Sequence, residues 1–196
     1  NGPTWWGTGV TGKPVFLTYS FSTSLQPYVT ATAIYTQAFL DSFTPLTTHA
    51  IALARAALAR WAALSGITFF EVPAGQGDLQ FSSAKFSLSP TYATSDGASN
   101  FPSSLIENDL AGDVFIDSDS NGFTENVWLY LHEIGHALGL KHPFDGGTAG
   151  NQTFLPDSLN NRGTTVMAER PPANPSTDPV NTGQLDAMDI TAIQYL

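Results

Sequence analysis

The chain has 196 residues, a formal net charge of −10 at pH 7 and no cysteine. A chain of this length buries about 70% of its unfolded surface, so one domain can form a core without cross-links. The lack of cysteine excludes thiolate metal ligands, cysteine nucleophiles and disulfides. Seven Lys and Arg residues, with no basic cluster, argue against nucleic acid as a partner. No apolar run reaches the about 18 residues that a membrane span needs.

The first predicted element is a strand at residues 15–21, which are mostly apolar, aromatic or β-branched. A long helix should follow at residues 44–64, with Thr44 as its cap and Pro45 in its first turn. Ser65 and the glycine after it should end this helix. Its expected apolar stripe consists of Ile51, Leu58, Trp61 and Leu64.

The remaining predicted elements are short strands followed by two shorter helices. Strands are expected at residues 67–72, 78–81 and 113–117, a sheet-edge strand at 98–101, and helices at 124–138 and 186–195. This order indicates an α+β or α/β lobe whose sheet is backed by two helices. The tail after Gly139 is rich in Gly, Pro, Asn and Thr and should form a second, smaller lobe.

The most informative segment is HEIGHALGLKH at residues 132–142. On a helix, His132 and His136 are about 40° apart around the axis and about 6 Å apart along it, so both imidazoles face one point. This spacing suits two bonds of about 2 Å to one zinc ion. Gly139 can adopt the positive φ that ends the helix, so the turned chain can return His142 as a third ligand. Three protein ligands and an open fourth position are typical of a catalytic zinc site.

Glu133 leaves the helix beside the histidine pair and is the predicted general base. A lone His-x-x-x-His pair is mostly incidental, but three of the four histidines belong to this pattern. The residue frequencies give a chance expectation on the order of a few in 10⁶ for it. The fourth, His49, is expected not to be a ligand. The alternatives are a non-catalytic, zinc-stabilised protease-like module of a surface or adhesin protein, and a zinc hydrolase that acts on a non-protein amide.

The motif, with glycine before the third histidine, resembles the metzincin clan of metallopeptidases. TVMA at residues 165–168 is similar to the Met-turn of that clan, which implies that Met167 lies beneath the zinc site. Within the clan the chain most resembles the serralysins of peptidase family M10. This likeness rests on ITFFEV at 67–72, on Pro143 after the third histidine, and on the final helix at 185–194. It implies a secreted bacterial zinc endopeptidase that cleaves proteins or peptides, and we expect a monomer.

The resemblance also implies an α+β, zincin-like fold with a twisted, mostly parallel sheet and an antiparallel edge strand. We expect one catalytic domain over residues 1–196, divided into lobes at 1–139 and 140–196. Two features depart from the serralysin pattern. Glu169 stands where serralysins carry a tyrosine two residues after the Met-turn methionine, so no tyrosine role can be transferred. The glycine- and aspartate-rich calcium-binding repeats of serralysins do not occur in this sequence.

The segment around residues 97–102 has the position of the edge strand that binds substrate in this clan. A peptide would add to that edge as an antiparallel strand through backbone hydrogen bonds. A surface loop is the alternative for this segment. Val166 should form part of the wall of a side-chain pocket beside the zinc. The candidate substrate residues of the edge are Ala98, Ser99, Asn100 and Phe101.

An acidic turn after the predicted strand at residues 113–117 offers a possible calcium site. Asp117, Asp119 and Asn121 alternate as in the first half of an EF-hand loop. The twelfth position of that loop is Trp128 and not glutamate, which excludes an EF-hand. Phe115 stands where matrix metalloproteinases have a histidine, which argues against a second, structural zinc. The alternative to a calcium site is a solvated acidic turn.

Overall fold

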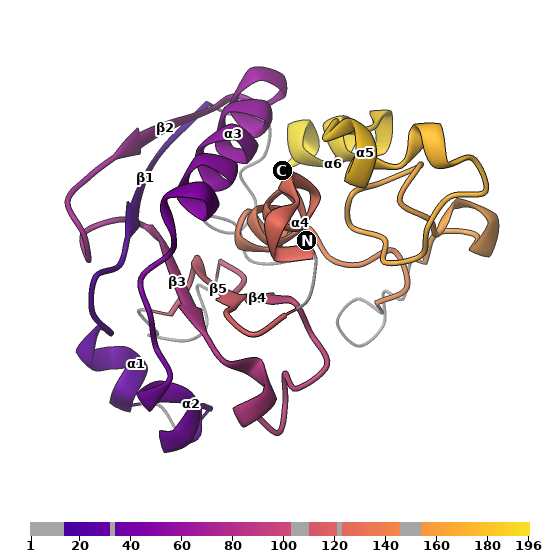
Figure 1. The fold of residues 1–196 in the computed structure, drawn as a ribbon. Coiled ribbons are helices and arrows are strands. Elements are labelled where there is room, and N and C mark those ends of the chain that lie inside the picture. Colours follow the sequence, from indigo (N-terminus) through magenta and orange to yellow (C-terminus); the bar gives the residue numbers. More distant parts are fainter. Residues whose placement is uncertain (1–13, 32–33, 103–109, 121–122, 146–153) are drawn as a thin grey trace.

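A computed structural model describes residues 14–31, 34–102, 110–120, 123–145 and 154–196 (Figure 1). The strands are β1 (Val15–Phe21), β2 (Ile67–Glu71), β3 (Leu79–Ala84), β4 (Gly97–Ser99) and β5 (Asp113–Asp117). The helices are α1 (Pro27–Ala31), α2 (Gln37–Asp41), α3 (Thr48–Leu64), α4 (Val127–Ala137), α5 (Pro179–Thr182) and α6 (Ala187–Tyr195). Short 3₁₀ turns are η1 (Phe86–Leu88), η2 (Phe123–Glu125), η3 (Asp157–Leu159) and η4 (Pro175–Thr177). None of the helices in these ranges is long and apolar enough to cross a membrane.

The five strands form one mixed sheet in the order β2–β1–β3–β5–β4. The first four strands in this order pair in parallel, whereas β4 runs antiparallel to β5 at the edge. The predicted α+β class, with a mostly parallel sheet and an antiparallel edge strand, is therefore confirmed. The predicted strands also occur at their expected places, within two or three residues at each end.

The two faces of the sheet are covered by different helices. Val114 and Ile116 of β5 belong to the main core, which they share with α3 and α4. Phe115 lies between them and points to the opposite face, as the alternation of a strand requires. There it packs in a second cluster with residues of α1 and α2. Helix α4 is thus held between α3 and the edge of the sheet, which places it beside β4 and β5 (Figure 1).

Helix α3 begins later than the sequence predicted. Thr47 is the cap, and its hydroxyl accepts a hydrogen bond from the N–H of Ala50 at 3.1 Å. Thr44 instead forms a β-bridge with Ser83, with backbone N···O distances of 2.8 and 3.1 Å. The predicted cap was wrong because Thr44 pairs with β3; a helix cap and a bridge residue both have extended backbone, so the residues next to Thr44 do not distinguish the two.

The buried face of α3 also differs from the predicted stripe. Leu58 and Trp61 are buried as expected, but Leu64 is 37% exposed. Three alanines complete the buried face instead, and small side chains let helix axes approach closely. The indole N–H of Trp61 donates to the carbonyl of Leu131 at 3.1 Å, which ties α3 to the middle of α4. The alanines are Ala50, Ala54 and Ala57.

The described residues after α4 contain little regular structure until α6 and lie beside α4, away from β1 and β2 (Figure 1). Helix α6 begins with a capping box, in which the Asp186 side chain accepts a backbone N–H and Asp189 accepts the N–H of Asp186 at 2.9 Å. The predicted closing helix is thus present. The proposed division into lobes at residue 139 stays a prediction.

Candidate metal centre and substrate cleft

Helix α4 supplies three of the predicted functional side chains. Asn126 caps the helix, and its side-chain oxygen accepts the N–H of Trp128 at 2.8 Å. His132, Glu133 and His136 follow in the next two turns, and each is less than 8% exposed. Apolar residues precede and follow these polar side chains along the helix, and their packing against α3 and the sheet fixes the helix backbone.

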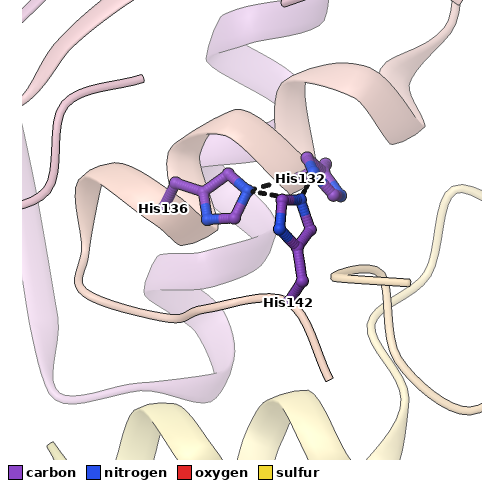
Figure 2. A group of neighbouring side chains, drawn as sticks. All are labelled: His132, His136 and His142. Carbon is purple, nitrogen blue, oxygen red and sulfur yellow. Dashed lines mark hydrogen bonds between the residues drawn. The ribbon is translucent and has the colours of Figure 1, made fainter. Parts of the chain in front are cut away.

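The three predicted zinc ligands converge on one point (Figure 2). The Nε2 atom of His136 lies 3.1 Å from that of His132 and 3.1 Å from that of His142. The third pair, His132 and His142, is separated by 3.2 Å. Among the described residues, these histidines are the one group of three or more potential ligands whose donor atoms lie within 4.8 Å of one another.

The turn after α4 returns the third histidine to the first two. Gly139 has φ +108°, a left-handed conformation that a side chain would strain, so its predicted role in ending the helix is confirmed. The carbonyl of Leu140 then accepts a hydrogen bond from Nδ1 of His136 at 2.8 Å. Two residues later, Nδ1 of His142 bonds to the carboxylate of Asp145 at 2.7 Å.

The hydrogen bonds at the outer nitrogens fix the tautomer of each ring. Nδ1 of His132 faces the carbonyl of Val166 at 2.8 Å, and the other two Nδ1 atoms face a carbonyl and a carboxylate. These oxygens only accept, so each Nδ1 carries the proton and each Nε2 has a bare lone pair. Three lone pairs that face one another repel unless a cation lies between them. Tetrahedral zinc, with bonds of about 2.0–2.1 Å, separates its ligand nitrogens by roughly 3.3–3.4 Å, which fits this cluster.

The pKa values of the two helical histidines favour the neutral form that binds metal. Burial lowers the pKa of His132 well below its usual value, and the neighbouring His136 adds to this effect. Burial also lowers the pKa of His136 to about 4, with a further contribution from His142. Neutral imidazoles at neutral pH are the form required of zinc ligands.

The carboxylate of Glu133 is buried next to the histidines. Burial raises its pKa to about 7, and the charges of Glu169 and Asp96 contribute in the same direction. A hydrogen bond from the hydroxyl of Ser99 to Oε2, at 2.5 Å, opposes part of that rise. A carboxyl group with a pKa near neutrality can both accept and return a proton at physiological pH.

The segment that resembles a Met-turn packs directly beneath α4. The carbonyl of Val166 accepts hydrogen bonds from His132 and, at 3.1 Å, from the indole of Trp128. Met167 is 3% exposed, and its sulfur lies where a side chain at Gly135 would have to be. Val166 is held from the other side by Asp189 of α6, whose two oxygens accept its N–H at 3.1 and 3.2 Å.

A cleft of about 480 Å³ opens over the histidine centre. The edge strand β4 contributes Ala98 and Ser99 to its wall, and Phe101 follows with its ring 5.3 Å from that of His136. Glu169 also lines the cleft, with an oxygen 3.6 Å from Nε2 of His142. Asn100 reaches Tyr35 with its side chain at 3.4 Å, and the fully buried Val166 is not among the lining residues. A substrate role for the residues named from the sequence stays a prediction.

The acidic turn after β5 uses its oxygens for local hydrogen bonds. One oxygen of Asp117 accepts the backbone N–H groups of Phe86 and Asp119, at 3.0 and 3.1 Å. Asp119 in turn accepts from the hydroxyl of Ser87 at 2.7 Å. Asn121 lies outside the described residues. Calcium binding at this turn stays a prediction.

Several supporting residues were not predicted from the sequence. Asp145, Asp189 and Trp128 each hold a part of the centre through hydrogen bonds. Only Asp145 left a signal in the sequence, as a carboxylate three residues after a predicted ligand, because a metal-binding histidine commonly donates its other ring N–H to a carboxylate. His49 is exposed and lies 3.2 Å from Glu125, so it belongs to the surface, as expected.

A set of three converging histidines, two of them buried, at the edge of a mixed sheet and with a buried carboxylate beside it defines a metallopeptidase type of domain. The comparisons agree with this class. The sequence profile of the family described as Matrixin, peptidase family M10, matches residues 35–153. The chain therefore belongs to the matrixin peptidase family.

Among curated proteins, the chain is similar to Serralysin G of Dickeya chrysanthemi. The two are 31% identical over 151 residues, which cover 72% of this chain and 30% of that protein. The chain thus spans less than a third of the length of the relative that it matches. This similarity agrees with the serralysin resemblance inferred from the motif.

Proposed function

We propose that the chain is a zinc-dependent endopeptidase domain, in which His132, His136 and His142 hold the metal and Glu133 is the general base. The observation that carries the proposal is the set of three Nε2 atoms, 3.1–3.2 Å apart, beside a buried carboxylate. When bound, zinc would polarise a water molecule and the substrate carbonyl.

The chain's own residues would move the proton and align the substrate. Glu133 would accept a proton from the attacking water and pass it to the nitrogen of the scissile bond, so that an amine leaves. Among the described strands, β4 pairs with β5 alone, so its outer side can accept an extended peptide as a further antiparallel strand. A peptide at that edge would pass next to Glu133, because Gly97 and Ser99 of β4 contact this side chain.

The deciding experiment measures zinc content and cleavage of denatured casein for the wild type and for Glu133→Ala. We expect about one zinc per chain in both proteins and a loss of activity of at least about 100-fold in the variant, since a positioned general base contributes that much. Glu125→Ala is a matched control, because Glu125 is 70% exposed and pairs only with the surface His49 among the described ion pairs. A wild type that binds zinc but cleaves no peptide would instead support the non-catalytic module.

We further propose that the protein acts outside the cell, as the serralysin resemblance implies. The absence of cysteine is compatible with export, because no thiol has to be protected from oxidation. Fractionation of a culture of the source organism, with an antibody against this domain, tests the location. Detection in the cell pellet alone would contradict it.

A further inference from the structure

The register of the edge strand aims two of its residues at α4. Gly97 lies opposite Ile116 and Ser99 lies opposite Val114 in the antiparallel pair of β4 and β5. Both partners belong to the core beneath α4, so Gly97 and Ser99 point toward that same side of the sheet. Ala98, between them, points to the other face and packs on the second cluster.

The two residues that face α4 contact the side chain of Glu133. The hydroxyl of Ser99 lies 2.5 Å from Oε2 and 2.8 Å from the backbone carbonyl oxygen of the same glutamate. In the described part of the chain, Ser99 is the one residue that donates a hydrogen bond to this carboxylate, which is 4% exposed. At Gly97, a Cβ atom would lie 2.6 Å from Oε1 and 2.8 Å from the carboxyl carbon. The carboxylate of Glu133 therefore packs against β4, with one oxygen where Gly97 has no side chain and the other at the hydroxyl of Ser99.

We propose that Ser99 is a positioning residue that holds the carboxylate of Glu133 in its working orientation, and that Gly97 leaves the space this orientation needs. The inference rests on the proposed endopeptidase function, because it assigns a partner to the general base of that reaction. A buried side chain with several rotatable bonds needs such a partner, since packing alone does not select one carboxylate orientation.

A hydroxyl suits this task better than an N–H donor would. Ser99 has one hydrogen and two acceptors within reach on Glu133, the carboxylate and the main-chain carbonyl. It can donate to the charged carboxylate. When Glu133 carries the proton during the reaction, Ser99 can accept that hydrogen and turn its own toward the carbonyl. The Glu133 side chain thus keeps its hydrogen bond to Ser99, and its position, whether the proton is on Oε1 or on Oε2.

The location on β4 predicts which kinetic constant depends on Ser99. Backbone hydrogen bonds at the open edge would hold a peptide, and these do not involve the Ser99 side chain, which points toward α4. A change of the Ser99 side chain should therefore lower kcat and leave KM nearly unchanged. The metal ligands lie on α4 and on the turn after it, so zinc content should not change either.

The test compares Ser99→Thr with Ser99→Val, because the two side chains have nearly the same shape and only threonine keeps the hydroxyl. Threonine and valine are both β-branched and favour strands, so a defect in folding should affect the two variants equally. We expect the valine variant to lose about 10- to 100-fold in kcat, as for the loss of one hydrogen bond to a charged group, and the threonine variant to stay within about 3-fold of the wild type. Zinc content and melting temperature should agree between the two variants. Ser176→Ala, at an exposed serine, is the control for a remote hydroxyl.

Each remaining outcome decides the question. Equal kcat values for the threonine and valine variants would overturn the positioning role while leaving the endopeptidase proposal intact. A wild type without peptidase activity would contradict the endopeptidase proposal itself. Gly97→Ala gives an independent check. The added methyl group would displace the carboxylate, so kcat should fall without loss of zinc, and an unchanged kcat would show that the glutamate does not need this space.

Discussion

Helix α4 and the segment from 154 to 189 both support the histidine centre, but different interactions hold them in place. Helix α4 is packed on α3 and the sheet, and the indole of Trp61 anchors it within an apolar core. The later segment has little regular structure and is held by buried polar contacts. The clearest example is Asp189, which is 1% exposed and accepts hydrogen bonds from Val166 and Thr165.

The difference shows how an irregular segment can be as well fixed as a helix. Backbone groups that lack a helical or strand partner must find one elsewhere if they are buried. Asp189 provides this for the loop that carries Val166, and Val166 in turn orients His132. A second contact of the same kind joins Arg162 to Asp178, with two bonds of 3.0 and 2.8 Å. Charge-assisted bonds of this kind add to the apolar contacts that Val166 and Met167 make with the main core.

The largest effect on stability is expected at Asp189. Asp189→Asn keeps the shape but replaces one accepting oxygen with a donor that faces the N–H of Val166 or the hydroxyl of Thr165. We expect the free energy of unfolding to fall by about 3 kcal/mol, as for a buried polar group left unsatisfied. Denaturant unfolding of the zinc-loaded protein measures it. Asp157→Asn is the control, because Asp157 is 85% exposed and its pair with Arg170 should contribute less than about 1 kcal/mol. Equal effects of the two variants would refute the role given to Asp189.

A smaller effect is expected where the two regions touch. Gly135→Ala adds a methyl group to α4 at the place of the Met167 sulfur. We expect a loss of about 2 kcal/mol from overpacking, although alanine by itself favours a helix by up to about 1 kcal/mol over glycine. The same change in a Met167→Ala background should be neutral or slightly stabilising. If Gly135→Ala lowered the free energy of unfolding equally in both backgrounds, Met167 would not be the side chain that the added methyl group overpacks.

The smallest expected effect is a difference in pH dependence. Burial by itself would raise the pKa of Asp178, but hydrogen bonds from Arg162 and from the N–H of Val180 outweigh it and hold the pKa below its usual range. A carboxyl group with a depressed pKa stabilises the fold above its unfolded pKa of about 3.9, and this contribution is lost as the pH falls through the folded value. Its size should be about 1.5 kcal/mol, as for one hydrogen bond to a charged group.

The measurement is the free energy of unfolding between pH 6 and 2, compared for the wild type and Asp178→Asn. The wild type should lose stability more steeply below about pH 4, whereas the two curves should run parallel above it. Parallel curves over the whole range would mean that Asp178 does not stabilise this segment through its charge.

Local patterns in the sequence were sufficient where one residue acts on its near neighbours. The 40° offset of His132 and His136 follows from helix geometry, and Gly139 has the positive φ that its position after the helix predicted. The strands were found because alternation and β-branched residues depend on nearby residues alone. Helices α1 and α2 were missed because five residues are too few to show a helical period.

The start of α3 shows the limit of a local rule. Thr44 and Pro45 form a plausible cap and first turn, and so do Thr47 and Thr48. The choice was made by Ser83, a partner on β3 that binds Thr44 as a β-bridge. Since that partner is 39 positions away along the chain, no pattern around Thr44 could have indicated it.

For this protein, the sequence by itself determined the histidine motif, the α+β class with its edge strand, and the resemblance to the serralysins. The tertiary structure decided which groups orient that motif. Asp145 holds His142, Val166 holds His132, and Ser99 meets Glu133 across the sheet edge. The physical reason is the range of the interactions. The ligand spacing is a property of one helix and the turn after it. Most of the orienting hydrogen bonds instead join α4 to β4 or to the segment from 154 to 189, and these parts of the chain meet only when the protein is folded.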